Sequence, residues 1–226
     1  MEEFLGVLFC GGRGTRINNL TKYISKSFLP VYNKPVFEFG LNLLTDSKSV
    51  NEIIILSNED NDHKLRKCGF RTIIQDDKEV TDMFSGWEYI KKITGTSKHG
   101  VLIPSDNICE VKVDDLTGKF IKKNADFLFS IHRIKDKKKL SDMGSFDTNA
   151  KKFYYKDPDP LSGYGVIAPY IIRNGFKNNT GRNTFECTGS YFLKHKSYWF
   201  DLGDYESIAE ANAWYRKKIK NQQTGL

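Results

Sequence analysis

The amino-acid sequence predicts an α/β fold whose central sheet is mostly parallel. The first observation is the run Phe-Leu-Gly-Val-Leu-Phe-Cys at residues 4–10, which is apolar throughout and suits a strand buried on both faces. The second is that short apolar strands alternate with amphipathic helices as far as residue 132. The third is that 226 residues fit one sizeable domain, and no long polar linker divides the chain.

The elements of the first half follow one another at short intervals. Buried strands are expected at residues 4–10, 52–57, 71–75, 100–104 and 126–132, and helices at 36–46, 60–68, 82–93 and 113–124. The third of these helices can be capped by Thr81 or Asp82, because both side chains can accept a hydrogen bond from a first-turn amide. Phe84, Trp87 and Ile90 fall on one face of it.

The second half has a different rhythm. From about residue 141 turns become frequent, and extended segments around 151–156 and 163–168 indicate antiparallel pairing. A last helix is expected over about residues 204–220, with Asp204 as its cap. We therefore predict a three-layer sandwich around a mostly parallel, Rossmann-like mixed sheet, in which ligands bind beyond the carboxyl ends of the strands.

Composition restricts the class of protein. The formal net charge is +7, with lysine clusters at 135–139 and 217–220, which fits either a solvated surface or an anionic partner. The aromatic residues lie within apolar elements rather than among the basic clusters, which argues against nucleic acid as that partner. No apolar run approaches the roughly 20 residues that span a bilayer, and the acidic N-terminus is unlike a secretory signal. The four scattered cysteines match no metal-ligand spacing and indicate reduced thiols in a cytoplasmic protein.

A glycine-rich loop, Gly11-Gly12-Arg13-Gly14-Thr15-Arg16, follows the first strand directly. Glycines let backbone amides approach a phosphate group closely, and the two arginines can add bidentate contacts. The loop lacks the Gly-Lys-Ser/Thr ending of a Walker motif, and Ile17 stands where the dinucleotide motif needs its third glycine. An ordinary tight turn between a strand and a helix is the alternative, which two arginines between buried elements make less attractive.

A second segment, Ser25-Lys26-Ser27-Phe28-Leu29-Pro30-Val31-Tyr32-Asn33-Lys34-Pro35, completes a recognisable pattern. With the glycine loop it resembles the sugar-1-phosphate nucleotidyltransferases, most closely the glucose-1-phosphate thymidylyltransferase branch. Members of that family carry Gly-Gly-x-Gly-Thr-Arg and then Ser-Lys-x-x-Leu-Pro-Val/Ile-Tyr-x-Lys-Pro. The resemblance implies that the loop wraps the nucleotide through Gly11, Gly12, Gly14 and Thr15. It also implies catalytic roles in neutralising the phosphates for Arg16 and Lys26.

Two further segments resemble the family's metal-binding motifs. Ser105-Asp106-Asn107 matches Gly-Asp-Asn with serine for glycine, and Trp199-Phe200-Asp201-Leu202-Gly203 matches Trp-Leu-Asp-Thr-Gly. The resemblance implies that Asp106 and Asp201 share one Mg²⁺ ion, which proteins usually hold with one or two carboxylates plus substrate phosphates. Taken singly, Asp106 could be a turn residue and Asp201 a helix-start carboxylate.

The residues expected to determine substrate specificity match the family less well. Lys156 occupies the place of the lysine in Glu-Lys-Pro that holds the sugar phosphate, but Tyr155 replaces the glutamate. Gln75 matches the base-contacting glutamine, while Val80-Thr81-Asp82-Met83 replaces the following Gly-Leu-Ala-Gln. Gly144 matches a glycine near the sugar hydroxyls. The resemblance is therefore strong for phosphate and metal chemistry and weak for specificity.

The resemblance implies one nucleotidyltransferase domain over residues 1–226, with a nucleotide-binding core (1–132) and an acceptor-binding portion that supplies the second metal ligand (133–226). The expected reaction transfers a nucleoside monophosphate, from dTTP by preference, to a glucose-1-phosphate type of acceptor and releases pyrophosphate. The alternatives are cytidylyl or uridylyl transfer to a different phosphorylated acceptor, and a non-catalytic nucleotide-binding relative. A monomer or homodimer is expected.

Overall fold

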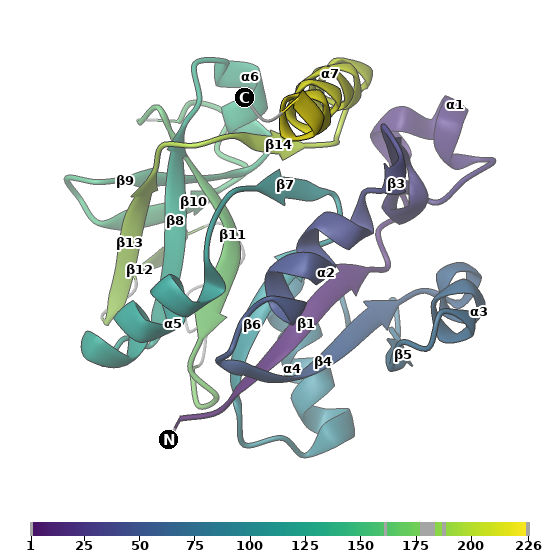
Figure 1. Ribbon diagram of the computed structural model, residues 1–226. Helices are drawn as coiled ribbons and strands as arrows, with labels where there is room; N and C mark the ends of the chain where they lie inside the picture. Colours follow the sequence, from purple (N-terminus) through teal and green to yellow (C-terminus); the bar gives the residue numbers. More distant parts are fainter. Residues whose placement is uncertain (1, 161, 177–183, 187–188, 225–226) are drawn as a thin grey trace.

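The computed structural model describes residues 2–160, 162–176, 184–186 and 189–224. Within these residues, ten strands form one mixed sheet in the order β12-β10-β9-β11-β6-β1-β4-β5, with β8 paired to β11 and β13 (Figure 1). Its strands are β1 (Phe4–Cys10), β4 (Val50–Ser57), β5 (Thr72–Ile74), β6 (His99–Pro104), β8 (Phe127–Arg133), β9 (Gly144–Asp147), β10 (Lys152–Tyr155), β11 (Tyr164–Ile172), β12 (Thr184–Glu186) and β13 (Ser190–His195).

The central strands β6, β1, β4 and β5 are parallel, and this confirms the predicted sheet type. Val7 in the middle of β1 lies opposite Ile54 on one side and Leu102 on the other. Alternate residues of β1 enter different cores, since Phe4 and Leu8 belong to one hydrophobic cluster whereas Leu5 and Val7 belong to another. Burial of both faces explains why this strand is apolar throughout.

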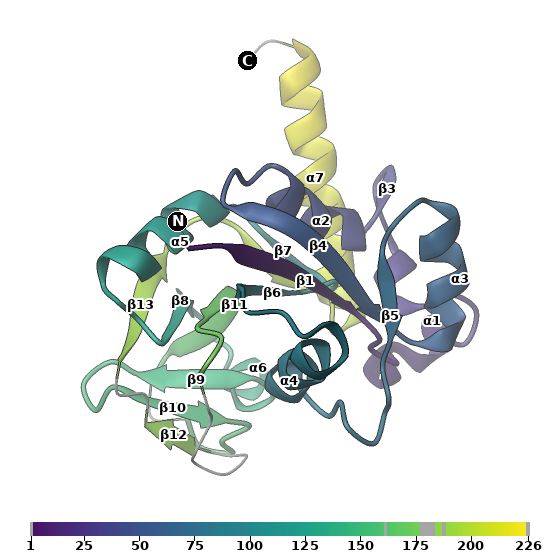
Figure 2. The same ribbon diagram turned by 90° about the horizontal axis from the view of Figure 1, so that it is seen from below.

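Helices cover both faces and complete the predicted three layers. They are α2 (Phe37–Thr45), α3 (Glu59–Lys67), α4 (Met83–Thr94) and α5 (Val113–Lys122). Helices α2, α3 and α5 contribute to the cluster around Leu8, whereas Trp87 and Ile90 of α4 pack against the opposite face (Figure 2). Asp82, one of the two predicted caps, accepts a 2.8 Å hydrogen bond from the Ser85 amide.

The second half is mainly antiparallel, as expected from its turns. Strand β11 runs antiparallel to β6, β8 and β9, and β10 runs antiparallel to β9 and β12. Strand β13 was not predicted; it pairs parallel with β8 along the whole of Ser190–His195. Short helix α6 (Lys137–Ser141) was also not predicted, because its lysines give no apolar periodicity.

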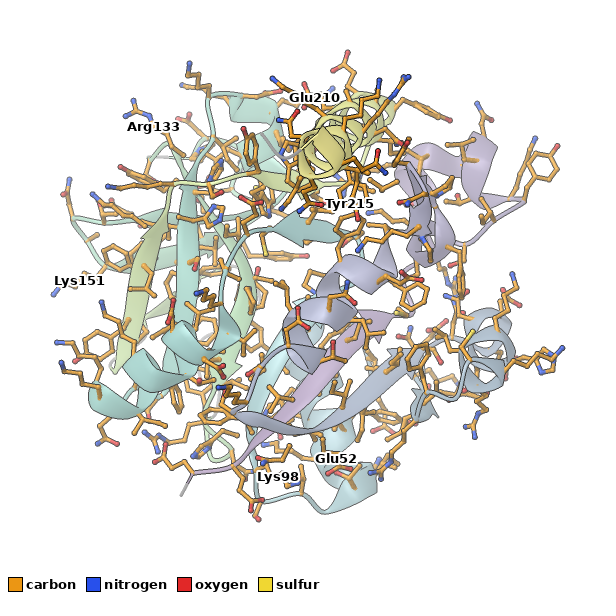
Figure 3. All side chains as sticks on the ribbon, in the orientation of Figure 1. Glu52, Lys98, Arg133, Lys151, Glu210 and Tyr215 are labelled. Atoms are coloured by element: carbon orange, nitrogen blue, oxygen red, sulfur yellow. The ribbon has the colours of Figure 1, made fainter. Side chains whose placement is uncertain are left out.

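Small elements attach the C-terminal helix α7 (Tyr205–Thr224) beside the glycine loop. They are η1 (Thr15–Ile17), α1 (Asn18–Thr21), η2 (Lys26–Phe28), β2 (Pro30–Val31), β3 (Lys34–Pro35), β7 (Asn107–Cys109) and β14 (Trp199–Asp201). A third apolar cluster joins them, with Ile17, Leu29, Ile108 and Leu202 buried together. Tyr215 lies on α7 (Figure 3). Its ring centroid is 4.9 Å from that of Phe39 in α2.

None of the helices in the described residues combines the length and apolar character needed to cross a membrane. Cys10, Cys68 and Cys109 are free thiols, while Cys187 lies outside the described residues.

Candidate active site

The glycine loop leaves β1 through a left-handed turn. Gly14 has φ 63° and ψ 37°, a conformation that suits glycine because residues with a Cβ rarely adopt it. Its carbonyl accepts hydrogen bonds from the Ile17 amide at 3.1 Å and from Thr21 Oγ1 at 2.9 Å. A Cβ on Gly14 would lie 2.6 Å from Thr21 Cγ2 and 3.2 Å from Lys26 Cβ. The turn therefore brings the chain back so that Lys26 lies beside the loop.

The other end of the loop meets the predicted base-contacting glutamine. A Cβ built on Gly11 would lie 1.9 Å from Oε1 of Gln75, so only glycine permits this close approach. Gln75 Nε2 donates a 2.7 Å hydrogen bond to Asp77, and Asp77 is also ion-paired to Arg13. These hydrogen bonds hold the pKa of the Asp77 carboxyl below its ordinary value. Arg13 is thus engaged with a carboxylate that the sequence motifs did not single out.

A cavity of about 990 Å³ opens beside this junction. Its lining includes Gly12, Arg13 and Gln75, together with Asn58, Asn61 and Lys64 from the start of α3. Two buried side-chain oxygens of this lining, Ser25 Oγ and Asn61 Oδ1, have no hydrogen-bond partner in the part of the chain that the structure describes. The cavity is therefore lined by polar and charged side chains that could contact a polar ligand.

Lys26 is positioned by its buried neighbour Ser27. The Ser27 hydroxyl lies 2.8 Å from Ser105 Oγ and 3.3 Å from the Cys10 carbonyl oxygen, so η2 is fastened to the ends of β1 and β6. Ser105 is the residue that replaces the family's glycine, and its hydroxyl is satisfied by this bond. The substitution is therefore accommodated within the protein interior.

The structure brings Arg16, Lys26, Asp106 and Asp201 together. The Lys26 ammonium is ion-paired to Asp106 Oδ2 and lies 3.9 Å from Asp201 Oδ1, while Arg16 lies 3.9 Å from Asp201 Oδ2. The side chain of Lys26 is only 10% exposed, so its charge acts in a poorly solvated environment. Gly203 lies against the Arg16 guanidinium, since a Cβ there would be 2.7 Å from Nη2.

The two carboxylates have different ionisation behaviour. Burial opposes ionisation of Asp106, but the Lys26 ammonium and hydrogen bonds outweigh it, and the pKa of Asp106 lies below its ordinary value. Burial, together with the neighbouring negative charge of Asp106, raises the pKa of Asp201 to about 6. Two carboxylates that repel each other in a poorly solvated place are suited to sharing a cation.

Backbone pairing holds the two carboxylates in register. Strand β14 pairs antiparallel with β7 so that Asp201 lies opposite Asn107, and the Leu202 amide donates a 3.0 Å bond to the Asp106 carbonyl (Figure 1). Asn107 Nδ2 donates to Asp106 Oδ1 at 3.0 Å, and Trp199 Nε1 donates to Asn107 Oδ1 at 3.0 Å. Residues nearly a hundred positions apart are thus linked by both main-chain and side-chain bonds.

The predicted acceptor residues lie together on a neighbouring part of the sheet. Gly144 in β9 pairs with Tyr155 in β10, and a Cβ on Gly144 would lie 2.7 Å from the Phe153 ring. Lys156 follows with φ 52°, and its amide donates a 3.0 Å bond to the Met143 carbonyl. Its ammonium is 5.4 Å from the Tyr155 ring centroid. Among the described residues, no ion pair joins Lys156 to either aspartate of the site.

Comparison with known proteins identifies the family of most of the chain. Residues 5–152 match the family described as Nucleotidyl transferase, which is more than half of the chain. The chain therefore belongs to the nucleotidyl transferase family, and the family resemblance inferred from its motifs is confirmed.

The relatives differ in substrate. One is the ribitol-5-phosphate cytidylyltransferase of Vibrio parahaemolyticus, 38% identical over 76 residues, or 34% of this chain and 31% of that protein. Another is the glucose-1-phosphate thymidylyltransferase of Neisseria gonorrhoeae, 38% identical over 56 residues, or 25% of this chain and 19% of that protein. The matched segments span less than a third of either relative's length.

A solved structure extends the likeness in fold to nearly the whole chain. A crystal structure from Bacillus anthracis, provisionally assigned as a glucose-1-phosphate thymidylyltransferase in complex with sucrose, superposes with a TM-score of 0.76. The match covers 94% of this chain and 95% of that one at 19% sequence identity. The likeness therefore shows a shared fold.

Proposed function

We propose that this chain transfers a nucleoside monophosphate from a nucleoside triphosphate to a sugar-1-phosphate, with release of pyrophosphate. The observation that carries the proposal is the convergence of two cations, Arg16 and Lys26, on two carboxylates, Asp106 and Asp201. These four side chains come from separate segments of the chain, and all four belong to motifs of the family.

The carboxylate pair fits a magnesium ion. Among the described residues no group of three or more His, Cys, Asp or Glu side chains could hold a metal ion unaided. Magnesium differs from most metals in this respect, because one or two carboxylates plus substrate phosphates usually suffice. Asp106 and Asp201 would hold the ion. In the structure, the ammonium of Lys26 lies close to both carboxylates. Bound there, magnesium would neutralise phosphate charge and align the triphosphate.

The remaining chemistry follows from alignment and charge. Amides of the loop at Gly11, Gly12, Gly14 and Thr15 hold the phosphates, and Gln75 contacts the base beside the cavity. Lys26 stabilises the α-phosphate in the transition state, and Arg16 stabilises the departing pyrophosphate. No side-chain base is required, since a phosphomonoester has a second pKa of about 6 and is already mostly ionised at pH 7.

The substrates within this class follow from resemblance. Likeness to glucose-1-phosphate thymidylyltransferases favours dTTP and glucose-1-phosphate, with Gly144 and Lys156 contacting the acceptor. On this proposal residues 1–132 bind the nucleotide, whereas 133–226 bind the acceptor and supply Asp201. We further propose that the enzyme works in the cytoplasm as a monomer or homodimer.

A second candidate is cytidylyl transfer to a different phosphorylated acceptor. Tyr155 at the place of the family's glutamate favours it, as does the likeness to a ribitol-5-phosphate cytidylyltransferase. Replacement of the Gly-Leu-Ala-Gln stretch by residues 80–83 removes side chains that would otherwise define the base.

A substrate panel tests both candidates. Purified protein is incubated with each of dTTP, CTP and UTP against glucose-1-phosphate and ribitol-5-phosphate, with and without Mg²⁺, and pyrophosphate is measured. The proposal expects magnesium-dependent release that falls on the order of 100- to 1000-fold in Lys26→Ala. Turnover only with CTP and ribitol-5-phosphate would select the second candidate. Nucleotide binding without turnover for any pair would indicate a non-catalytic relative.

A further inference from the structure

Lys139 differs from the other lysines of its cluster. Lys137 and Lys138 are exposed, but Lys139 is half-buried and lies next to Leu140, which is 2% exposed. The Asp136 carboxylate caps α6 by accepting bonds from the amides of Lys138 at 2.8 Å and Lys139 at 3.2 Å. The backbone of this lysine is therefore held in place, and its ammonium lies 5.3 Å from the centroid of the Trp199 ring.

The position over Trp199 places Lys139 near the carboxylate pair. Trp199 and Asp201 are two residues apart on β14, so their side chains point to the same face of the strand. The indole is also hydrogen-bonded to Asn107, the neighbour of Asp106. The Lys139 ammonium, over the Trp199 ring, therefore lies on the face of β14 that also carries the Asp201 side chain.

Helix α6, which carries Lys139, and the η1–α1 segment, which carries Arg16, lie apart, with α7 between them in Figure 1, and Figure 2 also shows them apart. An in-line displacement needs the entering and the leaving oxygen on opposite sides of the phosphorus. With pyrophosphate on the Arg16 side, the acceptor would enter from the α6 side.

The ammonium of Lys139 is available to bind an anion. Among the described residues, no carboxylate oxygen lies within 4.0 Å of this ammonium. Its contact with the Trp199 ring is a cation–π contact, which takes up none of the three N–H donors in a conventional hydrogen bond. Helix α6 also packs against β9, which carries Gly144. Lys156, by contrast, is exposed, and its ammonium lies 5.4 Å from the Tyr155 ring centroid.

We infer that Lys139 binds the phosphate of the acceptor and holds it on the α6 side of Asp201. The inference rests on the proposed nucleotidyl transfer and adds a residue to it. An oxygen of the acceptor phosphate forms a bond to the α-phosphorus of the triphosphate, the bond from that phosphorus to the bridging oxygen breaks, and its electron pair leaves with pyrophosphate. Lys139 neutralises the entering phosphate, which would otherwise be repelled by Asp201.

Steady-state kinetics of four variants test the inference. The assay uses whichever triphosphate and acceptor of the panel the wild-type protein turns over fastest, and varies each substrate in turn. Lys139→Ala should raise the KM for the acceptor by about 10- to 100-fold, the loss of one charged hydrogen bond, and leave the KM for the triphosphate within about twofold. Lys139→Arg keeps the charge and should restore most of the affinity. Lys138→Ala, on the exposed face of the same helix, should match the wild type.

The fourth variant, Lys156→Ala, separates the two lysines. An unchanged acceptor KM in Lys139→Ala, together with a raised one in Lys156→Ala, would overturn the inference while leaving the proposed reaction intact. An equal rise in the KM for both substrates in Lys139→Ala would also overturn it, because that pattern marks a general disturbance of the site. If the wild-type protein turned over no pair at all, the proposed function would fail and this inference with it.

Discussion

The indole nitrogen of Trp199 donates a 3.0 Å hydrogen bond to the side-chain oxygen of Asn107. The amide nitrogen of the same asparagine donates to Asp106 Oδ1 at 3.0 Å. The Asn107 side chain therefore links β14, which carries Asp201, to the carboxylate of Asp106. On the proposed magnesium role of Asp106, Asn107 and Trp199 would orient a metal ligand, and loss of such a partner typically lowers metal affinity by about 10- to 100-fold.

Replacing Trp199 should weaken magnesium-dependent turnover. Trp199→Phe keeps an aromatic ring on β14 but removes the donor to Asn107, so we expect the Mg²⁺ concentration for half-maximal activity to rise by about 10-fold or more. Asn107→Ala should act similarly, and the double variant should lose little beyond either single variant because both break one chain of bonds. Magnesium titrations of pyrophosphate release measure all three.

Trp214→Phe is the matched control for this prediction. Trp214 lies on α7, packs against Tyr198 and Phe200, and is not part of the chain of bonds to Asp106. It should keep the wild-type magnesium dependence. If the loss in the double variant equalled the sum of the losses in Trp199→Phe and Asn107→Ala, the two side chains would act independently, and this outcome would contradict the prediction.

Gly11 and Gly12 should respond differently to alanine. A Cβ on Gly11 would lie 1.9 Å from Gln75 Oε1, and the flexible end of Gln75 can move away, so Gly11→Ala should fold but displace the predicted base contact. We expect it to weaken triphosphate binding as much as Gln75→Ala does. Gly12 is exposed with no atom within 4 Å of a built Cβ, so Gly12→Ala should leave the thermal midpoint unchanged. Calorimetric nucleotide titration and thermal unfolding measure the two effects. Full nucleotide affinity in Gly11→Ala would refute the assigned role of Gln75.

The parts of the fold that could be predicted are those with strong local signals. Strand β1 is apolar because both faces are buried, and Asp82 was identifiable as a cap from its place before an amphipathic helix. Strand β13 was not predicted because its sequence, Ser-Tyr-Phe-Leu-Lys-His, shows no regular alternation of buried and exposed residues. It lies at a sheet edge, where its pairing with β8 holds it.

The candidate site could be predicted where motif and geometry coincide. The four charged residues of the site lie in segments with family-like spacing, and tertiary structure brings them together. They are Arg16, Lys26, Asp106 and Asp201. Lys139 could not be distinguished within a run of lysines, because its half-burial depends on Trp199, sixty residues later in the chain. The position of Asp77 beside the glycine loop likewise depends on tertiary contacts, with Arg13 and Gln75.

Asp114 should stabilise the fold in a pH-dependent way. Burial raises its pKa, but hydrogen bonds from the hydroxyls of Ser47 and Ser49 and from the amides of Lys48 and Ser49 dominate and lower it to about 2 from 3.8. A depressed carboxyl pKa contributes stability above 3.8 that is lost as the pH falls towards 2. Asp114→Asn should cost about 1–2 kcal/mol at pH 7 and progressively less below pH 3.8. Urea unfolding across that range measures it, and Asp115→Asn, at an exposed neighbour, should show no such trend.

A histidine pair at the end of β8 and β13 should make the fold sensitive to mild acid. His132 and His195 lie opposite each other in the strand pairing, with their Nδ1 atoms 3.2 Å apart. Burial lowers the pKa of both; Lys139 lowers that of His132 further, His132 lowers that of His195, and Glu110 partly offsets the effect on His195. The unfolded chain therefore takes up protons at a higher pH than the folded protein does.

The sign of the pH effect follows from this difference. As the pH falls below about 6.5, each such histidine binds a proton in the unfolded chain but stays neutral in the folded protein. This difference lowers the free energy of unfolding by up to about 1.4 kcal/mol per pH unit for each histidine. His195→Gln removes one of the two groups, so it should reduce the loss of stability between about pH 7 and 5. His63→Gln, at an exposed position on α3, should keep the wild-type slope. Urea unfolding at several pH values measures the slopes, and an identical slope in His195→Gln would show that this pair does not govern the acid sensitivity.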